Sequence, residues 1–271
     1  MRKKVVKIAS ILFPSLMVKL AYDKLTNPQL HKLREHEQAI LDKAEKDIFP
    51  FKGYDIQLYK WGNGTKKVML IHGWEGHAGN FADVIEKLVK NNYTVYGFDG
   101  PSHGLSSRGK TSLFEFTELV GVLIVKFEVE KLISHSFGGV ATTYSLAQNP
   151  HLKISKYVLL TTPNKFSERI SDLSTRVGIS QKVQKGLIQK VESEIEIKVD
   201  DLNVSDFVKK ANVAQALILH DKSDTVIDIS QSRNVFQNWP QCQMEELEGT
   251  GHFRILRIES VLERVVEFLD M

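Results

Sequence analysis

The sequence predicts an α/β fold, in which a mainly parallel central sheet is flanked by helices. Segments typical of strands alternate along the chain with segments whose apolar residues recur at helical spacing, and this alternation indicates βαβ units. Clusters of polar residues and glycines follow directly after several of the strand-like segments. In an open α/β sheet the functional residues gather at the carboxyl ends of the strands, so these clusters contain the candidate site residues.

Seven segments are predicted to be strands. Residues 54–61 alternate in polarity and are followed by a turn at Gly62-Asn63-Gly64. Residues 67–71 form a continuous apolar run, as expected of a strand that is buried on both faces. The remaining predicted strands are residues 93–98, 130–133, 154–160, 214–219 and 244–247.

Helices are predicted between these strands, over residues 81–89, 113–127, 140–148, 229–239 and 256–269. Residues 162–212 form a segment that is largely polar, with helical stretches and few strand signals. We expect its apolar residues to dock on the body of the domain or to line a substrate entrance. These residues are Phe166, Ile170, Leu173, Val177, Ile179, Leu187, Ile188 and Val191.

The composition is that of an ordinary globular protein. The chain has 271 residues, of which 42% are hydrophobic and 25% charged, enough for one large domain with an insertion. Cys242 is the single cysteine, so the chain has no internal disulfide and no cluster of thiols for a metal. We expect Cys242 to be a core residue. A cytoplasmic location is expected, with peripheral contact at a membrane as a further possibility.

The positive charge is concentrated at the N-terminus. Residues 1–34 contain eight Lys or Arg and one acidic residue, a net charge of +7. The remaining chain carries 28 − 32 = −4, so the body is mildly acidic. This distribution argues against a nucleic-acid-binding body.

Three interpretations of the N-terminal segment remain open. The segment 5–22 is apolar but interrupted by Lys7, Pro14 and Lys19, and its longest uncharged run has eleven residues, against about 20 for a spanning helix. It is a helix packed on the body, an interfacial helix that contacts an anionic membrane through residues 1–26, or a signal or anchor without a clear cleavage site. A second helix is predicted from Asn27-Pro28 to about Asp47. Residues 1–50 are therefore a basic, amphipathic helical extension, and residues 51–271 form the main domain.

The most informative motif is Ser134-His135-Ser136-Phe137-Gly138-Gly139, which lies between a predicted strand and a predicted helix. A serine at such a turn exposes its hydroxyl, and the N–H groups of the helix N-terminus favour a developing negative charge. The motif resembles the nucleophile elbow of the α/β-hydrolase fold family, G-x-S-x-G. Ser134 departs from the pattern, because glycine is usual at its position.

The resemblance implies a serine, an acid and a histidine in this chain order. It assigns Ser136 as the nucleophile and His252, in the loop Gly249–Phe253, as the general base. Asp224, in the polar segment after strand 214–219, is the preferred acid, and Asp221 remains the alternative. The oxyanion hole is implied to consist of the backbone N–H groups of Phe137 and Trp74.

The other histidines are expected to be structural. His72 and His103 precede glycines in turns, and His135 is expected to point away from the pocket. His77 and His220 have no partners at metal-ligand spacing, so neither a metal nor a cofactor is expected. The segment 99–106 resembles a structural turn of the same family. The resemblance also implies that residues 162–212 are a short helical cap insertion, because they lie where this family inserts a cap over the pocket.

Two hypotheses of function follow. The first is a serine hydrolase that cleaves a small-molecule carboxylic ester or thioester through an acyl-enzyme, with no nucleic-acid partner. The alternative is a non-catalytic α/β-hydrolase-like binding protein, associated with a membrane surface through its N-terminal arm. Ser136 argues against haloalkane dehalogenase and epoxide hydrolase chemistry, where the elbow carries aspartate, whereas peptidase, lactonase and perhydrolase activities remain open.

Overall fold

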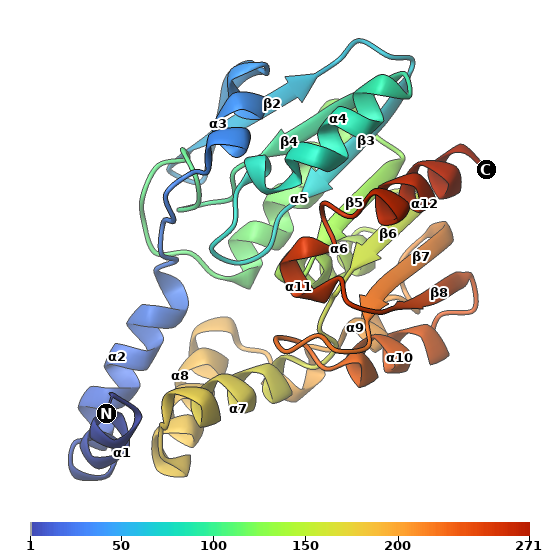
Figure 1. The fold of residues 1–271 in the computed structure, drawn as a ribbon. Helices are drawn as coiled ribbons and strands as arrows, with labels where there is room; N and C mark the ends of the chain where they lie inside the picture. The colour runs from blue at the N-terminus through green and yellow to red at the C-terminus, as the bar shows by residue number, and fades with distance from the viewer. Residues whose placement is uncertain (1) are drawn as a thin grey trace. The chain divides into compact units, whose positions relative to one another are not determined.

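The structure is a computed structural model that describes residues 2–271 (Figure 1). Its contacts divide the chain into two compact units. The larger unit consists of Pro28–Asn164 and Val204–Met271, and the smaller unit combines residues up to Asn27 with Lys165–Asn203.

The larger unit is built on one eight-stranded sheet in the order β1-β2-β4-β3-β5-β6-β7-β8. Strand β2 is antiparallel to both of its neighbours, and all the other pairs are parallel. The predicted α/β fold with a mainly parallel sheet is therefore confirmed. The strands are β1 (Glu45–Phe51), β2 (Tyr54–Trp61), β3 (Lys66–Ile71), β4 (Tyr93–Phe98), β5 (Lys131–His135), β6 (Ile154–Leu160), β7 (Val213–Asp221) and β8 (Cys242–Leu247).

Helices cover both faces of this sheet (Figure 1). Helices α4 (Ala82–Lys90) and α12 (Glu259–Asp270) pack together on one face and bury Ile85, Leu262 and Phe268 against the strands. On the other face lie α5 (Leu113–Phe127) and α6 (Phe137–Gln148). The shorter elements of this unit are α3 (Glu35–Asp42), η1 (Ala78–Phe81), α9 (Val204–Phe207), α10 (Ile229–Gln237) and α11 (Gly251–Arg254).

The predicted elements agree closely with the observed ones where the sequence signal is strong. Strands β2 and β6 and helix α5 have the predicted bounds. Helix α6 begins at Phe137 rather than at residue 140, because it continues directly from the turn at Ser136. The helix predicted over 256–269 is α12, which begins at Glu259, and the short helix α11 lies before it in the segment predicted to be a loop.

The helix predicted from residue 27 to about residue 47 is wrong at both ends. Residues 28–34 are not helical, and α3 begins at Glu35, where the Glu37 side chain accepts a hydrogen bond from Arg34 N (2.9 Å). Residues 45–51 form the edge strand β1 rather than the end of a helix. Pro50 hid this strand from the sequence pattern, since proline is tolerated in a sheet only at an edge or a bulge.

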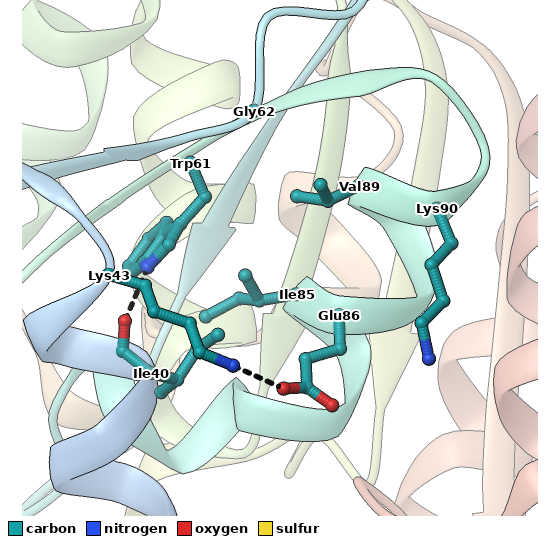
Figure 2. A pocket seen from close by; sticks show the side chains of 8 residues that line it. All are labelled: Ile40, Lys43, Trp61, Gly62, Ile85, Glu86, Val89 and Lys90. Atoms are coloured by element: carbon teal, nitrogen blue, oxygen red, sulfur yellow. Dashed lines mark hydrogen bonds and ion pairs between the residues drawn. The ribbon is translucent and has the colours of Figure 1, made fainter.

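Helix α3 docks on β2 and α4 beside a shallow hollow of about 330 Å³ (Figure 2). Trp61 Nε1 donates a hydrogen bond to Ile40 O (2.7 Å), and Lys43 pairs with Glu86 (3.1 Å). The lining residues include no serine, cysteine or histidine. The hollow therefore offers no hydroxyl or thiol nucleophile and no imidazole base.

The smaller unit consists of α1 (Arg2–Leu12), α2 (Pro14–Thr26), α7 (Phe166–Val177), α8 (Gln181–Ile195) and η2 (Val199–Asp201). Its core contains Ile170, Leu187, Val191 and Val199, packed with Ala21, Tyr22, Leu25, Phe166 and Ile188. These insertion residues pack against α2, a contact between two segments that are far apart in the sequence. The predicted boundaries at residues 50, 162 and 212 stay predictions.

Candidate active site

The turn between β5 and α6 holds Ser136 in a strained conformation. Its φ of 54° and ψ of −122° lie in a region that residues other than glycine rarely adopt. The glycines that follow are required by close packing. A Cβ at Gly138 would lie 2.4 Å from Ile71 O, and a Cβ at Gly139 would lie 2.2 Å from Thr162 Oγ1. The first turn of α6 is thus pressed against the ends of β3 and β6.

Ser134, which stands where the family pattern has glycine, is accommodated by a polar partner. Its side chain is completely buried, and its Oγ lies 2.8 Å from the hydroxyl of Tyr157 on β6. Buried hydroxyls cost free energy unless they are hydrogen-bonded. The pair therefore explains how a serine fits beneath the turn without leaving an unpaired polar group.

Ser136, His252 and Asp224 form one continuous chain of hydrogen bonds. His252 Nε2 lies 3.1 Å from Ser136 Oγ, and His252 Nδ1 lies 2.7 Å from Asp224 Oδ2. The side chains of His252 and Asp224 are 4% and 0% exposed. With a proton on Nδ1, the imidazole donates to Asp224 and its Nε2 is free to accept the proton of the Ser136 hydroxyl.

The environment of Asp224 keeps its carboxyl group ionised. Burial raises its pKa, but hydrogen bonds from His220 and His252 outweigh burial and hold the pKa well below its usual range. Its other oxygen accepts from the N–H groups of Val226 (2.7 Å) and Ile227 (3.0 Å). A negative carboxylate in this position orients an imidazole and stabilises the imidazolium form.

Asp221, the alternative acid, lies in a different environment. It accepts hydrogen bonds from Ser223 and from the turn Thr250–Gly251, and it does not contact the His252 ring. Burial raises its pKa, yet these hydrogen bonds bring the pKa well below its usual range. The carboxylate in contact with the imidazole is therefore that of Asp224.

The two implied oxyanion donors lie close to Ser136. A Cβ at Gly73 would be 3.3 Å from Ser136 Cβ, so the loop after β3 runs directly against the turn. Phe137 is the first residue of α6, and an N–H group at that position has no acceptor within the helix. The rings of Trp74 and Phe137 meet edge to face at 5.1 Å. Their role as donors stays a prediction.

His72 and His103 are buried beneath this loop. His72 Nε2 accepts from Gly100 N (2.8 Å), which fixes its proton on Nδ1. Burial lowers the pKa of His72 well below its usual value and that of His103 to about 4. Both rings therefore stay neutral at neutral pH, as expected of structural groups.

Among residues 2–271, neither a reactive cysteine nor a cluster of metal ligands forms a second site. Cys242 is buried, and burial raises its pKa to about 12, so it stays a protonated thiol. Among residues 2–271, no three His, Cys, Asp or Glu side chains are grouped so that they could hold a metal ion.

One known family matches the part of the chain that contains Trp74 and Ser136. The sequence pattern of the serine aminopeptidase S33 family matches residues 62–201, just over half of the chain. The chain belongs to this family. The match includes the turn at Ser136 and the loop at Trp74 but ends before Asp224 and His252. The S33 pattern therefore includes Ser136, whereas the places of Asp224 and His252 are known only from the structure.

Two curated relatives of this S33 protein match over shorter segments. An uncharacterized hydrolase, YugF, of Bacillus subtilis (strain 168) is 27% identical over 118 residues, which are 41% of this chain and 42% of that protein. The pimeloyl-[acyl-carrier protein] methyl ester esterase of Xanthomonas campestris pv. campestris (strain B100) is 29% identical over 92 residues, 34% of this chain and 35% of that protein. The matches thus span less than half of the relatives' length.

Solved structures establish the fold over almost the whole chain. Est1E from Butyrivibrio proteoclasticus, bound to ferulic acid, superposes with a TM-score of 0.67 at 19% identity and covers 82% of this chain and 97% of that one. A lipase candidate (lip1) from Acinetobacter baumannii AYE gives a TM-score of 0.66 at 17% identity, covering 89% and 98%. The S33 protein therefore has the α/β-hydrolase fold that its sequence motif indicated.

Sequence reasoning missed the side chains that support His252. His135 Nε2 lies 2.8 Å from His252 O although the two residues are 117 positions apart. His135 was expected to point away from the pocket; it is buried and contacts the backbone of the candidate base. No local pattern signals such a contact, since it depends on how β5 and the loop after β8 meet.

Proposed function

We propose that this chain is a serine hydrolase that cleaves a carboxylic ester or thioester through an acyl-enzyme. The observation that carries the proposal is the hydrogen-bonded chain Ser136–His252–Asp224 at the strained turn before α6. A serine hydroxyl is a poor nucleophile unless a base removes its proton and a third group orients that base. The distances of 3.1 Å from His252 to Ser136 and of 2.7 Å from His252 to Asp224 support these two roles.

The reaction proceeds in two halves. Ser136 Oγ attacks the carbonyl carbon while its proton passes to His252 Nε2, and the N–H groups of Phe137 and Trp74 hold the resulting oxyanion. The protonated His252 then donates its proton to the leaving oxygen or sulfur, which leaves the acyl group on Ser136. A water molecule then attacks the acyl carbon while His252 Nε2 takes its proton, and His252 passes this proton to Ser136 Oγ as the bond to the acyl group breaks and the acid leaves. Asp224 accepts a hydrogen bond from the Nδ1–H of His252 throughout and stabilises the imidazolium in each half.

The ester or thioester class is supported by the names of similar proteins. The Xanthomonas relative is named for the hydrolysis of a methyl ester. The structures with the same fold include a thioesterase domain from the curacin biosynthetic pathway, with a TM-score of 0.60 at 16% identity and coverage of 83% of this chain and 99% of that one. The S33 family name denotes peptidases instead, so amide cleavage is the alternative outcome of the test.

Active-site labelling tests this proposal. A fluorophosphonate probe should label the full chain at Ser136, and Ser136→Ala should abolish the label. Ser155→Ala is the matched control, because Ser155 Oγ only donates to Glu130 O at the start of β6. Turnover of p-nitrophenyl esters and of amino-acid p-nitroanilides then separates the two substrate classes. A folded wild-type protein that the probe does not label contradicts the proposal.

A second proposal concerns residues 1–26, which we propose contact an anionic membrane surface. Seven large apolar side chains of this segment are between 48% and 64% exposed: Val5, Ile8, Ile11, Leu12, Phe13, Leu16 and Leu20. Lys3, Lys4, Lys7 and Lys19 are exposed among them. An apolar helix face flanked by lysines is typical of interfacial helices, whose cations face anionic headgroups. Among residues 2–271, no helix is long and apolar enough to cross a bilayer.

Vesicle co-sedimentation tests the membrane proposal. The wild-type protein should bind phosphatidylglycerol-containing vesicles, bind less at high salt, and lose binding in Ile8→Glu. Val125→Glu is the matched control, because Val125 is 60% exposed on α5 of the larger unit, close to the 58% of Ile8. Equal binding of all three proteins, or self-association of the wild type in place of vesicle binding, contradicts the proposal. Loss of hydrolysis in His252→Ala with vesicle binding retained would show that catalysis and membrane contact are separate properties.

A further inference from the structure

His252 lies in a segment that has little structure of its own. Helix α11 contains only four residues, and the glycines on either side of Thr250 have positive φ angles of 74° and 63°. A helix this short makes hardly any internal hydrogen bonds. The position of the His252 ring therefore depends on contacts from other elements.

Asp221 supplies the first of these contacts. Its Oδ2 accepts from Thr250 N, from Thr250 Oγ1 (2.9 Å) and from Gly251 N (2.9 Å). Its Oδ1 accepts from Ser223 N (2.7 Å) and Ser223 Oγ (2.6 Å), next to Asp224. One completely buried carboxylate thus joins the loop that carries the acid to the turn that carries the base.

His135 supplies the second contact. Its Nε2 lies 2.8 Å from the carbonyl oxygen of His252, and a carbonyl can only accept, so the single proton of the neutral ring is on Nε2. Burial, followed by the charge of His252, lowers the pKa of His135 to about 3. The ring is therefore neutral, and it lies 4.9 Å from the His252 ring. His135 also directly precedes Ser136, so this bond joins the base to the strand that carries the nucleophile.

We propose that Asp221 and His135 are positioning residues that together fix His252 between Asp224 and Ser136. Asp221 sets the separation of the base from the acid, and His135 sets its separation from the nucleophile. The inference rests on the proposed hydrolase function. A displacement of about 1 Å in a catalytic group can cost about 100-fold in rate, and supporting side chains of this kind maintain that geometry.

Asp221→Asn tests the first half of the proposal. An amide has one acceptor oxygen, so it satisfies either Ser223 or the Thr250–Gly251 turn but not both. We expect kcat for a p-nitrophenyl ester to fall about 10- to 100-fold, with KM changed less than about twofold. Asp228→Asn is the matched control, because Asp228 only caps α10 by accepting from Ser230 N (2.9 Å). Thr250→Val, which removes one donor to Asp221, serves as a milder variant if Asp221→Asn does not fold.

A double-mutant cycle separates positioning from a general structural role. If Asp221 acts through His252, Asp221→Asn should cost nothing further in a His252→Ala background. A merely structural role would lower the residual activity by the same factor in both backgrounds. Equal factors in the two backgrounds, or an unchanged kcat in the single variant, overturn the proposal for Asp221.

Two substitutions of His135 test the second half. Gln has a side-chain nitrogen close to the position of Nε2 and keeps a donor for His252 O, whereas Phe keeps a ring of similar size without a donor. We expect His135→Phe to lower kcat about tenfold and His135→Gln to recover most of it. Equal losses in both variants would show that only packing matters and would overturn the role of His135. Residual activity in Ser136→Ala equal to wild type would instead contradict the proposed function itself.

Discussion

The two units of this protein differ in how they use their apolar residues. In the larger unit the central strands β3, β5 and β6 are mostly buried, and residues such as Val68, Leu132 and Leu217 are completely excluded from solvent. In the smaller unit one cluster of four buried apolar residues is accompanied by seven large exposed ones within the first 20 residues. A close-packed interior fixes atoms in place. An exposed apolar face is instead available for contact with a partner or a membrane.

The difference indicates a division of tasks between the units. The candidate reacting groups all belong to the larger unit, where buried side chains hold them at hydrogen-bond distances. Seven of the large exposed apolar residues are concentrated within the first 20 residues, whereas those of the larger unit are spread along its sequence. Changes in the larger unit should therefore affect chemistry and folding, and changes on the outer face of α1 should affect neither.

The largest expected effect is that of His252→Ala. Removing the general base of a serine hydrolase costs about 10⁴- to 10⁶-fold in kcat. The measurement is steady-state hydrolysis of a p-nitrophenyl ester beside urea unfolding. Activity within tenfold of wild type would remove His252 from the mechanism.

Core truncations should differ between the units. Leu217→Ala on β7 should lower the free energy of unfolding by about 3 to 5 kcal/mol, because its close-packed surroundings cannot collapse into the cavity. Leu187→Ala in the smaller core should cost about 2 to 3 kcal/mol, since fewer packed groups surround it. Chemical denaturation measures both, with the 40% exposed Leu173→Ala as the control. A larger cost at Leu187 than at Leu217 would reverse the comparison.

The buried carboxylates of the site should make the larger unit sensitive to acid. Burial raises the pKa of Asp221 and Asp224. The hydrogen bonds that these carboxylates accept lower the pKa by more than burial raises it, so that it lies well below the usual range. A carboxyl whose folded pKa is depressed contributes stability above its unfolded pKa of about 3.9, and this contribution disappears as the pH falls through the folded pKa. Tm should therefore fall as the pH is lowered below about 4. The Tm of Asp221→Asn should fall less steeply with pH than that of the wild type. An equally steep fall in both proteins would contradict a contribution of Asp221 to the sensitivity to acid.

Loss of the partner of Ser134 should have a moderate effect. Tyr157→Phe leaves the buried Ser134 hydroxyl without its 2.8 Å partner, which costs about 1 to 3 kcal/mol. The double variant Ser134→Gly/Tyr157→Phe removes both polar groups and should recover part of the loss, as measured by thermal unfolding. If the double variant is less stable than Tyr157→Phe alone, the hydroxyl pair is not the reason that serine fits there.

The smallest expected effect on folding is that of Ile8→Glu. Its side chain is 58% exposed, and surface substitutions usually change the unfolding free energy by less than about 0.5 kcal/mol. The same variant is expected to lose vesicle binding. A clear drop in Tm would show that the outer face of α1 contributes to folding and would blur the contrast between the two units.

The amino-acid sequence predicted the elements of the sheet wherever the apolar pattern was strong. Strands β2 and β6 could be delimited from sequence alone because turns and polar residues bound them on both sides. Strand β1 could not, since Pro50 and a charged start conceal this edge strand, which pairs with β2. The pairing of α2 with α8 was also invisible, because it joins segments about 160 residues apart whose apolar stripes fit many partners.

By itself the sequence determined the nature of the turn at Ser136, because glycines and a small residue around a serine between a strand and a helix permit few backbone paths. It also determined that acidic and histidine candidates would lie at later strand ends. Only the tertiary structure decided that Asp224 rather than Asp221 contacts His252, since the two carboxylates are three residues apart and their directions depend on the loop. It likewise decided that Asp221 and His135 hold the loop of His252. Hydrogen bonds across 29 and 117 positions leave no periodic signature in a chain and exist only once the strands are aligned.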